Sequence, residues 1–173
     1  MGYSTTFEGS IQIDPPLNDS EIQYLKNFSK TRHHQRKSGS YTIDLKDDIY
    51  SAHEKNDIDT INFNKEENDV PSLYCCWEPS DDGQYLNWNG IEKCYYPKEW
   101  LEYLIENFLK NNSIAKQDNE GFSFLQSHTL NGIFEAQGEM EDDHYYLVVE
   151  NNKVFVSLEK KEISLKKNKK YNI

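Results

Sequence analysis

Hydrophobic and polar residues alternate along residues 3–13, and this pattern predicts a strand with one face toward a core. The apolar face carries Phe7, Ile11 and Ile13, while polar side chains fall on the other face. The strand is expected to end at the two prolines after Asp14, because proline cannot donate to the hydrogen-bond ladder. The first predicted element is therefore a half-buried strand.

Short apolar runs bounded by turn residues predict further strands along the chain. The dipeptide Asn89-Gly90 is favoured in type I′ turns, and Asn151-Asn152 separates two apolar runs in the manner of a hairpin. The predicted strands lie at 41–45, 73–77, 85–88, 92–96, 121–125, 130–137, 145–149 and 154–158. Such closely spaced turns indicate antiparallel pairing between neighbouring strands.

Two segments show the apolar spacing of helices, at about 19–32 and 97–110. Asn18 followed by Glu21 is the capping-box pattern that starts the first helix. Pro97 suits the first position of the second helix. The apolar stripe of the second helix is the most regular in the chain and comprises Trp100, Leu101, Leu104, Ile105, Phe108 and Leu109. We expect both helices to bury their apolar stripes against the sheet.

This order of elements predicts an α+β fold, with one largely antiparallel sheet and two main helices packed on one face. The length of 173 residues suits one domain, which we assign to residues 1–159. Within it, 38–70 is predicted to be an irregular, partly mobile insertion, because 46–70 carries little apolar surface. Residues 160–173 are predicted to form a Lys-rich C-terminal tail.

The net charge of −11 is unevenly distributed. Residues 160–173 hold six lysines and one glutamate, so the other 159 residues hold 13 basic and 29 acidic residues, a net charge of −16. An acidic body repels phosphates, and direct binding to nucleic acid is not expected. The charge suits a protein that meets a basic surface, or one that is simply well solvated.

No apolar run approaches the roughly 20 residues of a membrane-spanning helix, and the first ten residues lack the basic and apolar regions of a signal peptide. The three cysteines, Cys75, Cys76 and Cys94, are odd in number and form no CxxC pair. Adjacent strand residues face opposite sides of a sheet, so Cys75 and Cys76 should not share a partner. These features predict buried thiols, a reducing cytoplasm and no contact with a membrane.

Sequence signatures of chemistry are absent. The five histidines are scattered, without the spacing of a zinc site, so no metal ligand is assigned. No phosphate-binding glycine loop, nucleophile elbow or Cys–His nucleophile is present, so no cofactor and no catalytic residue are assigned. An enzymatic activity is left open without support, and a non-enzymatic protein is favoured.

Both arginines of the chain, Arg32 and Arg36, lie just after the first predicted helix. A guanidinium binds phosphate with two parallel hydrogen bonds, so a basic island in an acidic protein suits a nucleotide ligand. Basic residues are also common at the C-terminal end of a helix, where they interact favourably with its dipole. The arginines are therefore candidate ligand-binding residues with an ordinary structural alternative.

A second group of candidates surrounds two tryptophans. Trp77 and Trp88 lie on adjacent predicted strands, where they form either part of the core, which is favoured, or a stacking platform for a ligand. Asn89, Glu92 and Lys93 follow directly. A buried Glu92 suits acid–base chemistry, but neighbouring Lys93 is directed to the other face of the strand, so no catalytic pair results.

An acidic run lies near the C-terminal hairpin and comprises Glu135, Glu139, Glu141, Asp142 and Asp143. It lacks the ligand spacing of a calcium-binding EF-hand loop. A solvated loop between strands is the simpler interpretation. The alternative is a partner-binding surface that mimics phosphate and occupies the nucleic-acid site of another protein.

Several motifs carry a family resemblance. They are MGYxTxFxG at 1–9, WxP at 77–79, DG at 82–83, WNGxEK at 88–93 and EWLxYLI at 99–105. They resemble a family of small uncharacterised proteins from bacteria and their phages, over about two thirds of the chain that leave out 38–70 and the Lys-rich tail. The chain departs from this family at His33-His34, where relatives are more basic, and at Cys94, where an aromatic residue is usual.

The resemblance implies an accessory protein of a phage or prophage in a bacterial host cell, which acts by binding. We therefore expect an inhibitor that blocks a defence or host protein or sequesters a small nucleotide signal. One alternative is a small enzyme that acts on a nucleotide or nucleic acid, with Glu92 beside Arg32 or Arg36 in one cleft. Another is an immunity or structural partner protein. The sequence leaves the oligomeric state open.

Overall fold

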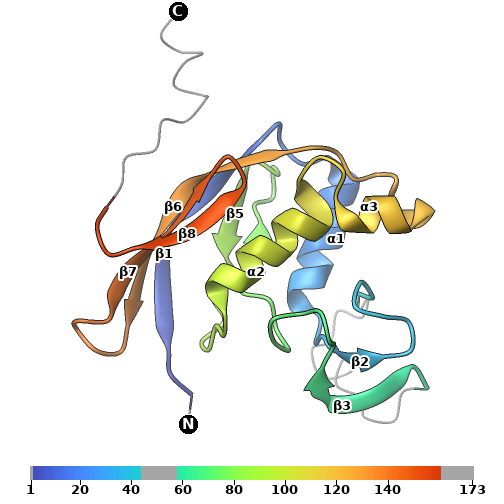
Figure 1. Ribbon diagram of the computed structural model, residues 1–173, viewed down its shortest axis with the longest axis horizontal. Coiled ribbons are helices and arrows are strands. Elements are labelled where there is room, and N and C mark those ends of the chain that lie inside the picture. Colours follow the sequence, from blue (N-terminus) through green and yellow to red (C-terminus); the bar gives the residue numbers. More distant parts are fainter. Residues whose placement is uncertain (1, 44–57, 161–173) are drawn as a thin grey trace, which may run out of the picture.

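The alternating N-terminal segment forms strand β1, which lies inside a six-stranded sheet of order β4-β5-β1-β6-β7-β8 (Figure 1). All neighbouring strands of this sheet are antiparallel. The computed structural model describes residues 2–43 and 58–160. The strands are β1 (Thr5–Asp14), β2 (His34–Arg36), β3 (Thr60–Glu66), β4 (Trp77–Pro79), β5 (Tyr85–Trp88), β6 (Thr129–Gly138), β7 (His144–Glu150) and β8 (Lys153–Ser157).

Two main helical segments cover one face of the large sheet (Figure 1). Helix α1 begins with the predicted capping box, in which Asn18 and Glu21 each bond to the backbone of the other. Helix α2 continues into the π-helical turn η2, so the predicted second helix changes its winding in its last turns. The helical elements are α1 (Asp19–Lys30), α2 (Pro97–Leu104), η2 (Ile105–Leu109), α3 (Ile114–Asp118) and η3 (Glu120–Phe122). The predicted α+β fold is therefore confirmed.

The core lies between the helices and the inner face of the sheet. Phe7, Ile11 and Ile13 are buried there, as the alternating pattern of β1 predicts. From the helices, Phe28 packs edge-on against Trp100, with ring centroids 6.2 Å apart. The apolar faces of β1 and of the helices thus contribute these buried side chains, as their periodicities predict.

The hairpin between β7 and β8 is confirmed. The type I′ turn predicted at Asn89-Gly90 is wrong, and the φ angles of such a turn occur at Asn151-Asn152 instead. Asn151 and Asn152 both have positive φ angles, 49° and 69°, as a type I′ turn requires. At the other candidate turn only Gly90 has a positive φ, 82°. There the Asn89 side chain accepts a hydrogen bond from the Ile91 amide at 3.0 Å, which makes the turn an Asx turn.

Several predicted strands are wrong. Residues 92–96 form a loop, and 121–125 begin in the 3₁₀ turn η3, where the Asn119 side chain accepts from the Gly121 amide. Of 73–77, only Trp77 belongs to a strand. Residues 41–43 are in no strand, and the remainder of the predicted strand at 41–45 lies outside the described residues. Local apolar content does not distinguish these loops from strands, because loops also carry apolar residues that tertiary contacts bury, such as Cys75, Phe122 and Leu125.

In its described residues, the predicted irregular insertion contains the strand β3. β3 pairs with β2 in a separate two-stranded sheet, which lies beside the helices (Figure 1). Residues 44–57 of this insertion and 161–173 of the Lys-rich tail lie outside the described residues. In the part of the chain that is described, no helix has the length and apolar character needed to cross a bilayer.

Candidate ligand-binding site: a tyrosine pocket

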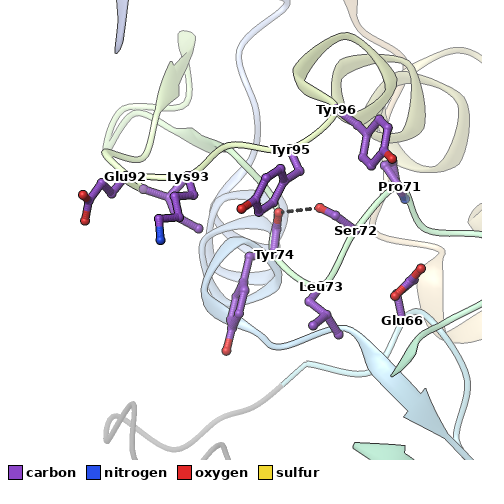
Figure 2. Close-up of a pocket in the computed structure, with 10 residues that line it drawn as sticks. Glu66, Pro71, Ser72, Leu73, Tyr74, Glu92, Lys93, Tyr95 and Tyr96 are labelled. Carbon is purple, nitrogen blue, oxygen red and sulfur yellow. Dashed lines mark hydrogen bonds between the residues drawn. The ribbon is translucent and has the colours of Figure 1, made fainter. Parts of the chain in front are cut away.

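A cavity of about 660 Å³ opens between the loop that precedes α2 and the segment that precedes β4 (Figure 2). We call it the tyrosine pocket, because Tyr74, Tyr95 and Tyr96 line it. Pro71, Ser72, Leu73 and Ile91 complete its uncharged walls, and Glu66, Glu92 and Lys93 are its charged residues. Figure 2 shows Tyr95 and Tyr96 on one side, with Leu73 and Glu66 on the other. The pocket thus combines aromatic walls with a few charged groups.

Tyr96 is held outward by an unusual backbone conformation. It precedes α2 with a φ of 59°, in the left-handed region that side chains other than glycine rarely adopt. Pro97 follows at the first helical position, and the Tyr96 carbonyl accepts from the Trp100 amide at 2.9 Å. The ring is 59% exposed and that of Tyr95 is 48% exposed. The chain therefore places two large aromatic side chains at the surface, beside an open cavity.

A disulfide between Cys76 and Cys94 joins the two sides of the pocket. Cys94 directly precedes Tyr95, and Cys76 directly precedes β4. The prediction that all three cysteines are thiols is wrong, because the loop returns to β4 and brings these two within a Cα–Cα distance of 5.5 Å. Cys75 remains a buried thiol. As predicted, the adjacent Cys75 and Cys76 do not share a partner.

The opposite wall of the pocket is anchored to the helices. The Ser72 hydroxyl donates to the Tyr74 carbonyl at 3.1 Å and accepts from the Trp100 indole N–H at 2.7 Å. The Leu73 carbonyl accepts from the His33 amide at 2.7 Å. The backbone behind Leu73 and Tyr74 is thus hydrogen-bonded to the core before any ligand arrives.

Arg32 supports the pocket from behind. Its Nε and Nη2 donate to the Phe63 carbonyl at 3.2 and 3.0 Å, and its Nη1 donates to the Tyr74 hydroxyl at 3.2 Å. The guanidinium carbon also lies 4.2 Å from the centroid of the Phe63 ring, in cation–π contact. Three of its five N–H groups are therefore used inside the protein.

The other residues of the predicted ligand group are spread over the fold. Arg36 is buried in β2, where its amide donates to the Glu67 carboxylate at 3.0 Å. Trp77 is 1% exposed and stacks on Phe134 with ring centroids 4.4 Å apart, and half-buried Trp88 packs against the same core. The structure therefore supports the core interpretation of both tryptophans.

Asn89 has a structural position as well. Its Nδ2 donates to the Ser29 hydroxyl and to the Cys75 carbonyl, both at 2.8 Å. Glu92 and Lys93 line the tyrosine pocket, and Figure 2 shows the Glu92 carboxylate directed away from the tyrosines. The structure thus brings these two candidates together, but places Arg36, the tryptophans and Asn89 elsewhere.

The predicted acidic surface lies on the hairpin between β6 and β7. Much of it is used for local contacts: the Ser4 amide donates to Glu139 Oε1 at 2.7 Å, and the Tyr3 hydroxyl donates to Asp143 Oδ2 at 2.5 Å. His144 Nε2 lies 2.7 Å from Glu135 Oε1. Glu141 and Asp142 are exposed in the same turn. This run ties the N-terminal segment to the hairpin.

Sequence reasoning did not select the tyrosines. The usable signal is the adjacent pair Tyr95-Tyr96, which is too close to Pro97 and its helix to continue a strand. Sequence reasoning also missed a buried pair, in which His128 Nε2 lies 2.7 Å from Glu21 Oε2. The capping-box pattern selects Glu21, but no local pattern connects it with a histidine 107 positions away.

Within residues 2–43 and 58–160, no group of three or more His, Cys, Asp and Glu side chains is arranged to hold a metal ion. No protein-family model, curated protein or solved structure matches this chain. The resemblance to small bacterial and phage proteins therefore stays a prediction. The function has to be inferred from the tyrosine pocket itself.

Proposed function

We propose that this protein is a non-enzymatic binding protein that holds a segment of a partner protein in the tyrosine pocket. One observation carries the proposal: Tyr95 and Tyr96 are about half exposed and border an open cavity. Tyrosine supplies a large contact area with few rotatable bonds, and it is enriched in the energetic centres of protein interfaces. Exposed apolar patches beside a cavity are typical of interaction sites.

The charges around the pocket favour a peptide over a nucleotide. Glu66 and Glu92 outnumber Lys93, so the lining has a net negative charge that opposes a phosphate. Arg32, whose guanidinium contacts Tyr74 of this wall, has three N–H groups bonded to Phe63 and Tyr74. The sequence does not decide between the blocking of a protein and the sequestration of a nucleotide. The charges of the pocket support protein blocking better than nucleotide sequestration.

The enzymatic alternative is less well supported than binding. It needs Glu92 beside Arg32 or Arg36, yet no contact joins Glu92 to either arginine among the described residues, and Arg36 is buried in β2. The unpaired thiol is also unsuited to nucleophilic chemistry, because burial raises the pKa of Cys75 to about 12. These observations favour binding over catalysis.

We further propose that the partner is a host or defence protein and that binding takes place in the bacterial cytoplasm. The family resemblance and the acidic body support this proposal. The Cys76–Cys94 disulfide weighs against this location, because disulfides are rare in a reducing cytoplasm. The redox state of Cys76 and Cys94 in the producing cell, measured by thiol labelling, therefore tests the location separately from the binding function.

The test begins with selection of peptides from a random 12-residue display library on the full-length protein. Synthetic copies of the selected peptides are then titrated by calorimetry. We expect the double variant Tyr95→Ala/Tyr96→Ala to bind at least about 30-fold more weakly, since a hot-spot aromatic contributes about 2 kcal/mol. Tyr146→Ala is the control, because it removes a partly exposed tyrosine from β7, outside the tyrosine pocket.

Three results would overturn the proposal. The first is a failure to select any binding peptide, and the second is equal affinity for the wild type and the double variant. The third is tight binding of a nucleotide that the double variant abolishes, which would establish sequestration instead.

A further inference from the structure

A second cavity, of about 340 Å³, adjoins the tyrosine pocket and shares Pro71 and Tyr96 with it. We call it the acidic groove. We propose that the acidic groove is a subsite for an arginine or lysine side chain of the same partner segment that occupies the tyrosine pocket. This inference rests on the proposed function and adds the chemistry of the partner. Tyr96 would contact both parts of the bound segment, because it lines both cavities.

Carboxylates line the groove from two sides. Glu99, Glu102 and Glu106 recur at the spacing of one helical face along α2 and η2, and Asp69 lies across from them in the segment before β4. No lysine, arginine or histidine lines the groove among the described residues. The sequence pattern alone presents these glutamates as the solvated side of a helix. The structure instead places them along a concave surface.

Internal cations neutralise this surface only in part. Lys98 pairs with Glu102 and Lys110 pairs with Glu106, in both cases one helical turn apart. These ion pairs are more than a third exposed, and exposed pairs contribute little energy and exchange readily with a competing cation. Glu99 forms no ion pair with any described residue. The groove therefore retains negative charge that a basic ligand can meet.

Tyr103 supplies an independent observation that points to a ligand. This residue lines the groove and is only 7% exposed, yet its hydroxyl has no hydrogen-bond partner among the described residues. The Ser40 hydroxyl lies close to it but donates to Asp69 Oδ2 at 2.9 Å. Burial raises the pKa of the Tyr103 phenol, so the group remains neutral. A buried polar group without a partner is costly, and its oxygen, which has almost no accessible surface, would accept from an N–H donor of a ligand once the ring turns toward the groove.

These features select a cationic side chain over other ligands. A guanidinium can donate to two carboxylate oxygens at once, and an ammonium can donate to three acceptors. Either group is also attracted to the face of a tyrosine ring, which Tyr96 provides at the boundary with the tyrosine pocket. The preferred partner segment therefore carries a basic residue next to the apolar or aromatic side chain that enters the tyrosine pocket.

The test repeats the peptide selection on three proteins: the wild type, Glu99→Gln/Glu106→Gln, and the control Glu141→Gln/Asp142→Asn. The control removes two negative charges from the β6–β7 turn instead of the groove. We expect arginine and lysine to be enriched at one position of the peptides selected on the wild type and on the control. The groove variant should lose that enrichment and still select the apolar residue.

Calorimetry completes the test with one selected peptide and its analogue that has glutamine in place of the basic residue. We expect the groove substitutions to lower the affinity for the basic peptide about tenfold and to leave the affinity for the glutamine analogue unchanged. Absence of a basic preference, or an equal loss in the control variant, would overturn the subsite while binding through Tyr95 and Tyr96 persists. If Tyr95→Ala/Tyr96→Ala also leaves binding unchanged, the proposed function fails together with the subsite.

Discussion

His33 is 1% exposed and donates a hydrogen bond from Nε2 to the Phe28 carbonyl at 2.9 Å. Its ring lies 4.2 Å from that of Phe28 and 5.6 Å from that of Trp100, measured between centroids. Burial in this aromatic surrounding lowers the pKa of His33 to about 3. The histidine therefore packs as a neutral core residue, although its position in a basic segment suggests an exposed side chain.

This burial predicts how stability depends on pH. The unfolded chain takes up the proton of His33 near pH 6.5 and the folded protein near pH 3, so the free energy of unfolding falls as the pH decreases between these values. The slope from this residue is about 1.4 kcal/mol per pH unit. Urea unfolding at pH 7.5, 6.0 and 5.0 should show a smaller loss for His33→Gln than for the wild type. An unchanged slope in His33→Gln would contradict this role.

Glu21 is the second residue whose role depends on burial. Its Oε1 accepts from the Asn18 amide at 3.0 Å, and its Oε2 accepts from the Gln126 amide at 3.0 Å and lies 2.7 Å from His128 Nε2. This one carboxylate caps α1 and ties it to the segment before β6. A buried carboxylate is stable only with such partners.

Removal of Glu21 should therefore be costly. Breaking a buried pair leaves polar groups without partners, and we expect Glu21→Ala to lower the free energy of unfolding by about 3–5 kcal/mol. Asp19→Ala, in the exposed first turn of the same helix, is the control and should cost less than about 1 kcal/mol. Chemical unfolding measures both values, and equal losses would show that the network of Glu21 is not special.

At the scale of elements, the loop between β5 and α2 carries half of the lining of the tyrosine pocket, and the Cys76–Cys94 disulfide attaches it to β4. The two cysteines are 18 positions apart. A crosslink over a loop of this length stabilises a protein by about 3 kcal/mol through its effect on the unfolded chain. The disulfide therefore contributes to stability and also restricts the segment that carries Tyr95 and Tyr96.

Loss of this crosslink should affect both properties. We expect Cys76→Ser/Cys94→Ser to lower the free energy of unfolding by about 3 kcal/mol. This double variant should also bind a selected peptide more weakly, because the binding loop then loses more entropy on binding. Reductant should produce the same changes in the wild type and none in the double variant. A response of the double variant to reductant would show that the effect does not come from this bond.

The elements that could be predicted are those with a complete local pattern. β1, the β7–β8 hairpin and α1 each show their periodicity, turn pair or capping box within one segment. The loop at 92–96 could not be predicted, because a disulfide to Cys76, just before β4, and the positive φ of Tyr96 shape it. β3 exists through pairing with β2, and its own residues carry little apolar signal.

The candidate site was less predictable than the fold for a related reason. The sequence correctly draws attention to Glu92 and Lys93, which line the tyrosine pocket. It cannot show that the Arg32 guanidinium is directed to Phe63 and Tyr74, because that depends on contacts across 31 and 42 positions. Composition identifies charged and aromatic residues, but only the path of the chain decides which of them face a common cavity.

At the scale of the whole molecule, two acidic surfaces compete as the partner-binding face. One is the acidic groove beside the tyrosine pocket, and the other is the run at 135–143 on the β6–β7 hairpin. On the hairpin, Glu139 and Asp143 accept hydrogen bonds from the N-terminal segment, and Glu135 contacts His144. The groove instead combines unpaired charge with the exposed Tyr96, which it shares with the tyrosine pocket, and aromatic residues are enriched at interface centres.

The most direct test of this account is amide chemical-shift mapping of the ¹⁵N-labelled full-length protein during titration with a selected peptide. We predict that the largest shifts fall at 72–74, 91–96 and 99–106, around the tyrosine pocket and the acidic groove. Residues 135–143 should remain unaffected. Largest shifts on the β6–β7 hairpin, with none around Tyr95 and Tyr96, would contradict the assignment of the tyrosine pocket as the binding site.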